Sequence, residues 1–243
     1  MRKTVLAILL SLSLGATAQV RFHVGGGVGM ADMSDVTSSS NILSYRLGGG
    51  ADIHIGRVFS LRPAVYYTQK GTDFDGFYGA EQIEPAKFSV RSEYLEIPFL
   101  AGFDIHLNER SAIVLTVGPH LSCGLNGKTK VKARNSGSWD IDGGNFFDNT
   151  CDFGQQAYSS EKKPVQVPQF NRWDLGLMIG AAYEIRHFRF GLVYAHTLTE
   201  TATTHFEVED RHDPFYYDDL HDFYYNMTTP RNSTLHIVFD YIF

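Results

Sequence analysis

The sequence is poor in cysteine, in proline and in long apolar runs. Its 243 residues include only two cysteines and eight prolines. Two cysteines are too few for a disulfide-rich scaffold or for a structural zinc site. Beyond the N-terminal segment, no run approaches the 18 or more uncharged apolar residues that a spanning helix needs. We therefore expect either a protein free of the inner membrane or one that crosses a membrane with strands.

Enzyme motifs are lacking as well. The sequence contains no GxSxG nucleophile elbow, no HExxH helix and no phosphate-binding loop. We therefore expect no catalytic residues, no resident metal and no cofactor. The formal net charge of −6 also argues against a nucleic-acid partner, because such proteins present basic surfaces.

The N-terminus has the pattern of a secretory signal peptide. Arg2 and Lys3 precede an apolar run over residues 5–14, and the small residues Ala16 and Ala18 follow. The run is too short to cross a hydrocarbon core of about 30 Å. We expect residues 1–18 to be removed on export and the mature chain to begin near Gln19.

Apolar and polar residues alternate with a period of two in eight segments. Each is about ten residues long, the length of a tilted transmembrane strand. The last segment ends on the aromatic Phe243, with Phe239 and Tyr241 before it. This terminal pattern resembles the closing-strand signal of bacterial outer-membrane β-barrels. The segments are 20–30, 45–55, 59–70, 94–103, 113–124, 173–184, 188–197 and 233–243.

The connections between these segments alternate in length. Short ones at residues 55–58, 106–111 and 185–187 predict tight periplasmic turns, and the long ones predict extracellular loops. The sequence thus predicts an all-β fold, an eight-stranded antiparallel up-and-down transmembrane β-barrel with both ends in the periplasm. The predicted long loops cover about 31–44, 71–93, 125–172 and 198–232.

A soluble lipocalin-like barrel with an apolar interior is the alternative fold. Two features disfavour it. The polar face of the segments carries glycines and charges, and aromatic residues edge the apolar face, as interface girdles do in membrane barrels. The aromatics of that edge are Tyr45, Phe59, Tyr67, Phe103, Trp173, Tyr183, Phe188, Tyr194, Tyr241 and Phe243.

Four stretches carry a family resemblance. They are LRPAVYYTQKG (61–71), YLEIPFLAGF (94–103), LTVGPHLS (115–122) and WDLGLMIGAAYEI (173–185). The mature chain resembles the PorT-like family, porin-like eight-stranded outer-membrane barrels common in Bacteroidota. The resemblance implies an outer-membrane location at the cell surface, and it implies no substrate.

Charged residues fall on the face predicted to point inward. An eight-stranded barrel barely holds its own side chains, so these charges must pair with one another. We expect an interior plugged by ion pairs, in which His236 also takes part; a narrow gated pore is the alternative. Arg62 and Glu96, on neighbouring strands, are the first predicted pair. The predicted network comprises Arg21, Arg46, Asp52, Arg62, Glu96, Asp104, Asp174, Glu184, Arg189 and Asp240.

The fourth long loop concentrates acids and aromatics. Residues 200–231 hold eight acids against two bases. Exposed aromatics there would stack on sugars or anchor a protein partner. The alternatives are a solvated hairpin whose aromatics pack on each other, and a divalent-cation site that includes His212. The predicted contact residues are Phe215, Tyr216, Tyr217, His221, Phe223, Tyr224 and Tyr225.

The third long loop carries lysines and a cysteine. Lys128, Lys130 and Lys132 share one face if the fifth strand continues outward. They would bind anionic lipopolysaccharide or, as the favoured alternative, protect the edge of a hairpin. Cys123 and Cys151 are expected to form a disulfide, which would stabilise the loop by about 3–4 kcal/mol.

The expected role is structural, or surface contact through the extracellular loops. The alternatives are a narrow pore, a component of an export or assembly machine, and an enzyme with His120, Ser122 and His196 at the external rim. We expect a monomer whose partners are outer-membrane lipid, the barrel-assembly machinery and an extracellular protein or glycan. The assembly signal would be Phe239, Tyr241 and Phe243.

Overall fold

A computed structural model describes residues 19–36, 38–78, 84–133, 137–140, 145–147, 170–202 and 227–243. Within these residues the protein is built of strands, and no helix is long and apolar enough to span a membrane. Two strands are short, β2 (Ser39–Ser40) and β7 (Gly137–Asp140). The long strands are β1 (Gln19–Val36), β3 (Ile42–Ile55), β4 (Phe59–Tyr78), β5 (Glu84–Asn108), β6 (Ser111–Ala133), β8 (Trp173–Ile185), β9 (Phe188–Thr197) and β10 (Met227–Ile242).

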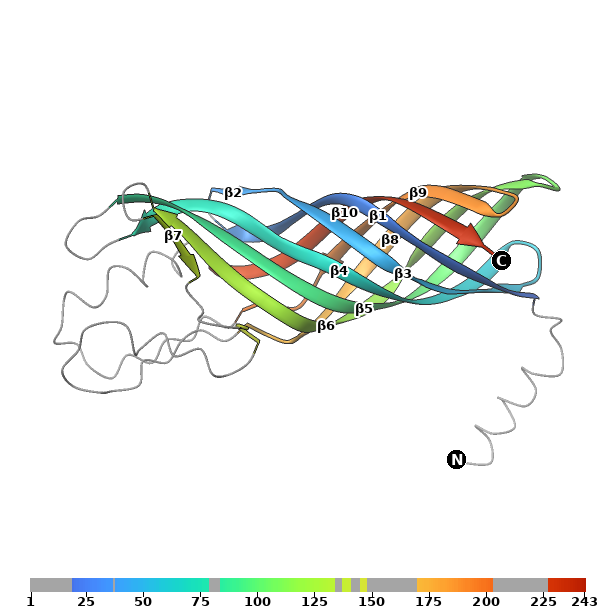
Figure 1. Ribbon diagram of the computed structural model, residues 1–243. Coiled ribbons are helices and arrows are strands. Elements are labelled where there is room, and N and C mark those ends of the chain that lie inside the picture. The colour runs from blue at the N-terminus through green and yellow to red at the C-terminus, as the bar shows by residue number, and fades with distance from the viewer. Residues whose placement is uncertain are drawn as a thin grey trace, which may run out of the picture.

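The eight long strands close into a ring. Each pairs antiparallel with the next along the chain, and β10 pairs with β1 to complete the barrel, as in the register Val24–Tyr241 and Val28–Ile237. Figure 1 shows the tilted strands, with the C-terminus and the start of β1 at one end. The tight turns at 56–58, 109–110 and 186–187 lie at the same end, which we call the turn end. Gly56 there adopts a φ of +79°. The predicted eight-stranded antiparallel barrel is confirmed.

The polarity of the barrel wall is reversed relative to a soluble protein. On the outward face, Phe22, Leu47 and Ile237 are 60 % exposed or more. On the inward face, Arg46 and Asp52 are buried. Apolar outward side chains need lipid around them, and a polar interior excludes the lipocalin-like alternative.

Aromatic pairs lie at both margins of this apolar surface. Phe59 and Phe103 pack edge to face at the turn end, with ring centroids 5.5 Å apart. Tyr45 and Tyr67 lie 6.2 Å apart at the opposite margin. We call the outward apolar surface between these margins the lipid belt. Aromatic rings at both margins match the girdles of membrane barrels.

Three strands continue past the lipid belt at the end opposite the turns, the loop end. There β4 runs on to Tyr78, β5 begins at Glu84 and β6 runs on to Ala133. In this extension the rings of Phe74 and Phe88 stack with centroids 5.1 Å apart. The predicted loop 71–93 is therefore strand over 71–78 and 84–93, and the predicted loop 125–172 is strand over 125–133 and 137–140. The predicted loop 31–44 shrinks to residues 37–41 between β1 and β3.

The strands keep their direction into the extension, but the apolar residues change sides. On β5, Leu95 and Ile97 face outward within the lipid belt, whereas Phe88 and Val90 are buried on the inner face above it. A β-bulge between Glu93 and Tyr94 lies at the transition. The extension therefore has the polarity of a water-soluble protein. Its buried cluster is Met33, Val36, Phe74, Ala86, Phe88, Val90, Tyr94, Val131, Phe146, Phe147, Phe170 and Ala202.

Candidate functional site

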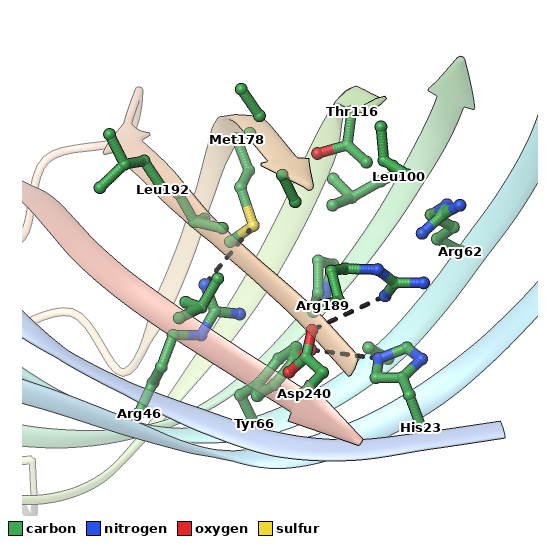
Figure 2. Close-up of a pocket in the computed structure, with 18 residues that line it drawn as sticks. His23, Arg46, Arg62, Tyr66, Leu100, Thr116, Met178, Arg189, Leu192 and Asp240 are labelled. Carbon is green, nitrogen blue, oxygen red and sulfur yellow. Dashed lines mark hydrogen bonds and ion pairs between the residues drawn. The ribbon is translucent and has the colours of Figure 1, made fainter. Parts of the chain in front are cut away.

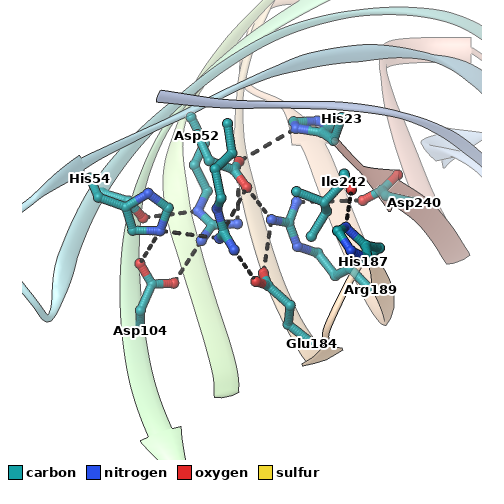
Figure 3. Close-up of polar contacts among 12 residues, drawn as sticks. His23, Asp52, His54, Asp104, Glu184, His187, Arg189, Asp240 and Ile242 are labelled. Atoms are coloured by element: carbon teal, nitrogen blue, oxygen red, sulfur yellow. Dashed lines mark hydrogen bonds and ion pairs between the residues drawn. The ribbon is translucent and has the colours of Figure 1, made fainter. Parts of the chain in front are cut away.

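The interior of the lipid belt is filled by ion pairs, and Asp52 of β3 lies at their centre. Asp52 Oδ1 lies 3.4 Å from Arg62 Nη1 and 3.4 Å from His23 Nδ1. Arg189 Nη2 donates to the other oxygen, and Arg62 Nη2 donates to Asp104 at 2.6 Å. Figure 3 shows this cluster between the strands. Because Asp52 is fully buried, its cationic partners must offset the hydration that it loses.

The strands on either side of the ring closure join the same network. Arg21 Nη1 of β1 donates to Glu184 Oε1 of β8 at 2.5 Å. Arg189 of β9 donates to Glu184 at 3.1 Å and lies 3.6 Å from Asp240 of β10. The Arg21–Glu184 contact ties β1 to β8 across the lumen, whereas Arg189 contacts its direct cross-strand neighbours Glu184 and Asp240.

A second cluster lies nearer the loop end, around Glu96 of β5. Lys70 Nζ lies 3.3 Å from Glu96 Oε2, and Arg46 Nη2 lies 3.5 Å from Glu96 Oε1. Lys70 also donates to Ser122 at 3.0 Å, and the Arg46 guanidinium lies 3.9 Å from the centre of the Tyr66 ring. Sequence reasoning left Lys70 out of the network, although its place in the strand alternation predicts an inward side chain.

Asp174 is held by an amide rather than by a cation. Asn232 Nδ2 donates to Asp174 Oδ2 at 3.1 Å and to Thr201 Oγ1 at 3.1 Å. Likewise, His236 is hydrogen-bonded to Ser44 at 2.8 Å. The structure thus brings all ten predicted charged residues to the interior, with Arg21 at its partly exposed margin.

The predicted Arg62–Glu96 pair is wrong. The register of β4 and β5 sets Arg62 opposite Leu100 and Glu96 opposite Tyr66. The two charged side chains therefore lie at different heights in the lumen, and each pairs within its own cluster. Arg62 binds Asp52 and Asp104, whereas Glu96 binds cations of the second cluster.

Little space remains between the two clusters. A cavity of about 60 Å³ lies there, with Arg46, Tyr66, Arg189, Asp240 and Met178 in its wall. Figure 2 shows the cationic and anionic side chains converging on it. Such a volume is that of a few water molecules, and its wall is mostly apolar apart from these charged groups. It offers no room for an organic substrate.

An aromatic plug, residues 145–147, fills the barrel mouth above the second cluster. Phe146 N donates to Gly127 O at 3.0 Å, and Gly127 N donates to Asn145 Oδ1 at 2.9 Å. The Phe146 ring stacks on Phe170 with centroids 4.0 Å apart. A Cβ on Gly127 would meet the Phe146 ring at 2.1 Å, so this close approach requires glycine.

The plug connects to the ion pairs below it. The Phe147 ring packs edge to face on Tyr94 at 5.5 Å, and Lys70 Nζ lies 4.8 Å from the centre of the Tyr94 ring. Among the described residues, ring contacts and ion pairs therefore fill the lumen from the mouth to the turn end, apart from the small cavity between the two clusters. The sequence carries no signal for residues 145–147, because they lie in a long connection without alternation.

The predicted rim residues do not form a shared site. His120 and Ser122 are buried on the inner face of β6. His196 faces outward on β9, where it is hydrogen-bonded to Ser233 at 2.8 Å. The wall of the barrel thus separates the two histidines, so the enzyme alternative finds no shared site in these residues.

Several of the remaining predicted residues lie outside the described part of the chain. Cys123 is a free thiol on the outward face of β6, beside Leu95 and Trp173 of the neighbouring strands, and its disulfide with Cys151 stays a prediction. Its partner Cys151, the signal peptide and the loop residues Phe215, Tyr216, Tyr217, His221, Phe223, Tyr224 and Tyr225 lie outside the described residues. Within the described part of the chain, no group of three metal-ligating side chains is found.

The closed ring, its apolar outer surface and its ion-paired interior together define a transmembrane β-barrel of the outer-membrane type. The chain belongs to the outer membrane protein beta-barrel domain family, whose model matches residues 14–202. It is therefore an integral protein of the outer membrane.

Solved structures offer a fold-level comparison. The chain is similar to Ail, the attachment invasion locus protein of Yersinia pestis, with 11 % identity, 92 % of this chain and 97 % of that chain covered, and a TM-score of 0.35. A structure of Ail with the heparin analogue sucrose octasulfate gives 11 % identity, coverage of 94 % and 100 %, and a TM-score of 0.35. A comparison with curated proteins finds no match.

Proposed function

We propose that this protein is a closed outer-membrane barrel that acts at the cell surface through its loop end. The observation that carries the proposal is the filling of the lumen by ion pairs and the aromatic plug. An interior without a path for solutes leaves the outer surface and the loops to perform the function.

The extension supports this role by raising the connections above the membrane. Strands β4, β5 and β6 run about ten residues past the lipid belt, or roughly 30 Å of strand. Their inner face is an apolar core, and their outer face carries charges such as Asp73 and Arg91. A solvated stalk of this kind leads to the connections that follow β4 and β6, whereas segment 213–226 lies between β9 and β10.

The contact itself is assigned to the aromatic segment 213–226. Six aromatic residues beside carboxylates give this segment the composition of a surface that stacks on sugars or anchors a protein. We propose an extracellular glycan or protein as the partner, and a monomeric barrel as the unit that binds it. No catalysis is proposed.

A pull-down from crosslinked outer membranes tests this role. A variant with Phe215, Tyr216, Tyr217, Phe223, Tyr224 and Tyr225 changed to serine keeps the loop length and its charge. We expect it to lose the extracellular partners that the native protein captures. An Asp218→Asn, Asp219→Asn variant is the control and should keep them. Retention of every partner by the serine variant would contradict the proposal.

The resemblance to the PorT-like group suggests a second role, in a protein export or assembly machine. In that case the native barrel should co-purify with periplasmic partners, and its deletion should cause a secretion defect. We also propose that a signal peptidase removes residues 1–18. The barrel-assembly machinery would recognise Phe239, Tyr241 and Phe243. N-terminal sequencing of the mature protein should begin near Gln19.

A further inference from the structure

A row of lysines follows the lipid belt on the outward face of β6. Leu121 and Leu125 face outward and are 40 % and 46 % exposed, as lipid-facing side chains are in this barrel. After a bulge at this level, Lys128, Lys130 and Lys132 take the same face and are all exposed. Lys128 lies three residue steps beyond Leu125, which is about 10 Å along the strand. The first ammonium group therefore lies where lipid headgroups begin.

The neighbouring strand adds two more cations. The register sets Arg91 of β5 opposite Lys128, and Lys87 opposite Lys132. Like charges directly opposite each other on a sheet are destabilising unless an anion lies between or beside them. We call these five residues, Lys87, Arg91, Lys128, Lys130 and Lys132, the basic face.

One acid, Asp73 of β4, lies between the two β5 cations, Lys87 and Arg91. It lies 2.7 Å from Arg91 Nη1 and 3.2 Å from Lys87 Nζ. Burial acts to raise the pKa of Asp73, but hydrogen bonds from Arg91 and Ser89 and the charge of Arg91 outweigh it and lower that pKa. Asp73 is thus ionised at neutral pH. Among the residues whose side chains the structure describes, no acid lies within ion-pair distance of Lys128 or Lys132, whereas the register sets Asp140 of β7 opposite Lys130.

Protection of a sheet edge does not account for these lysines. Over residues 130–133, β6 is hydrogen-bonded to β5 on one side and to β7 on the other. An edge would need charges because its backbone groups are unpaired, and here they are paired. Lys128 and Lys132, which lie opposite Arg91 and Lys87, therefore favour an external anion.

We propose that the basic face binds the phosphate groups of a phosphorylated glycolipid in the outer leaflet. Charge complementarity and the position directly above the lipid belt, on the lipid-facing side of the wall, favour a lipid over a soluble anion. Ammonium groups act as point charges toward phosphate and attract anionic headgroups near a membrane surface. The inference needs only a loop end that faces the cell exterior, so it stands apart from the proposed role of segment 213–226.

The test measures binding of fluorescent diphosphorylated lipid A to the full chain in phosphatidylcholine nanodiscs. A Lys128→Gln, Lys130→Gln, Lys132→Gln variant should bind on the order of tenfold more weakly or worse. The control is Arg57→Gln, Arg110→Gln, Arg186→Gln, which removes the same charge from exposed positions at the turn end and should change binding less than about twofold. An Asp73→Asn variant, which releases Lys87 and Arg91, should bind more tightly.

Two further probes decide the source of the anion. Dephosphorylated lipid A should lose the lysine-dependent binding, and soluble inorganic polyphosphate should compete only weakly. Equal losses in the two triple variants, unchanged binding of dephosphorylated lipid A, or complete competition by polyphosphate would each overturn the proposal. Retained heat-modifiable gel mobility shows that a variant has folded into a barrel.

Discussion

At the scale of single residues, Asp52 shows what a charge inside a narrow barrel requires. Its carboxylate lies within 4 Å of Arg21, His23, Arg62 and Arg189, which come from three other strands. A buried carboxylate without such partners would be strongly destabilising. Here it links strands that are distant in the sequence.

The Asp52→Asn change keeps the shape of the side chain and removes its charge. It leaves Arg62 and Arg189 buried with fewer anions, so we expect the free energy of unfolding to fall by about 3 kcal/mol. Urea-induced unfolding in lipid vesicles measures it. Asp75→Asn, at an exposed position of the extension, is the matched control and should change the free energy by less than about 0.5 kcal/mol. Equal effects of the two substitutions would contradict the assignment.

The inward placement of the charges could be predicted from the sequence, because alternation alone decides which face a residue takes. The partners could not. Arg62 and Glu96 lie on neighbouring strands, yet register sets them at different heights, and register depends on turn geometry and bulges that alternation does not encode. The pairing of Cys123 stays a prediction, because Cys151 lies outside the described residues.

At the scale of elements, the barrel strands and the extension follow opposite polarity rules. The predicted segments end where the apolar residues change faces, as at Leu95 on β5. A pattern that inverts its phase resembles the end of a strand, so the sequence indicated loops where β4, β5 and β6 continue. The strands inside the lipid belt, whose alternation keeps one phase, were predicted within a few residues.

The contact between the aromatic plug and β6 can be tested by a double-mutant cycle. A Cβ on Gly124 would lie 2.4 Å from the Phe147 ring, so Gly124→Ala must displace the plug. We expect it to lower the free energy of unfolding by about 1–3 kcal/mol. In a Phe147→Ala background the same change should cost little, because the obstructing ring is gone. The two effects should therefore be strongly non-additive, and simple additivity would contradict the packing.

At the scale of the whole molecule, side chains close the lumen at two levels. Ion pairs fill it within the lipid belt, and rings of the plug and of Tyr94 cover them at the mouth. Such an interior stabilises a rigid wall and leaves no route for solutes. What the described residues present to their surroundings is then a lipid belt, a basic face directly above it, and the extension of β4, β5 and β6.

Single-channel recording in planar bilayers tests the closed lumen most directly. The native chain should give a flat current trace at moderate voltages in either direction, because no continuous aqueous path crosses the ion pairs and the plug. Incorporation is verified by recovering the folded barrel from the same membranes. A steady, reproducible conductance from the native protein would contradict the account and would favour the narrow pore instead.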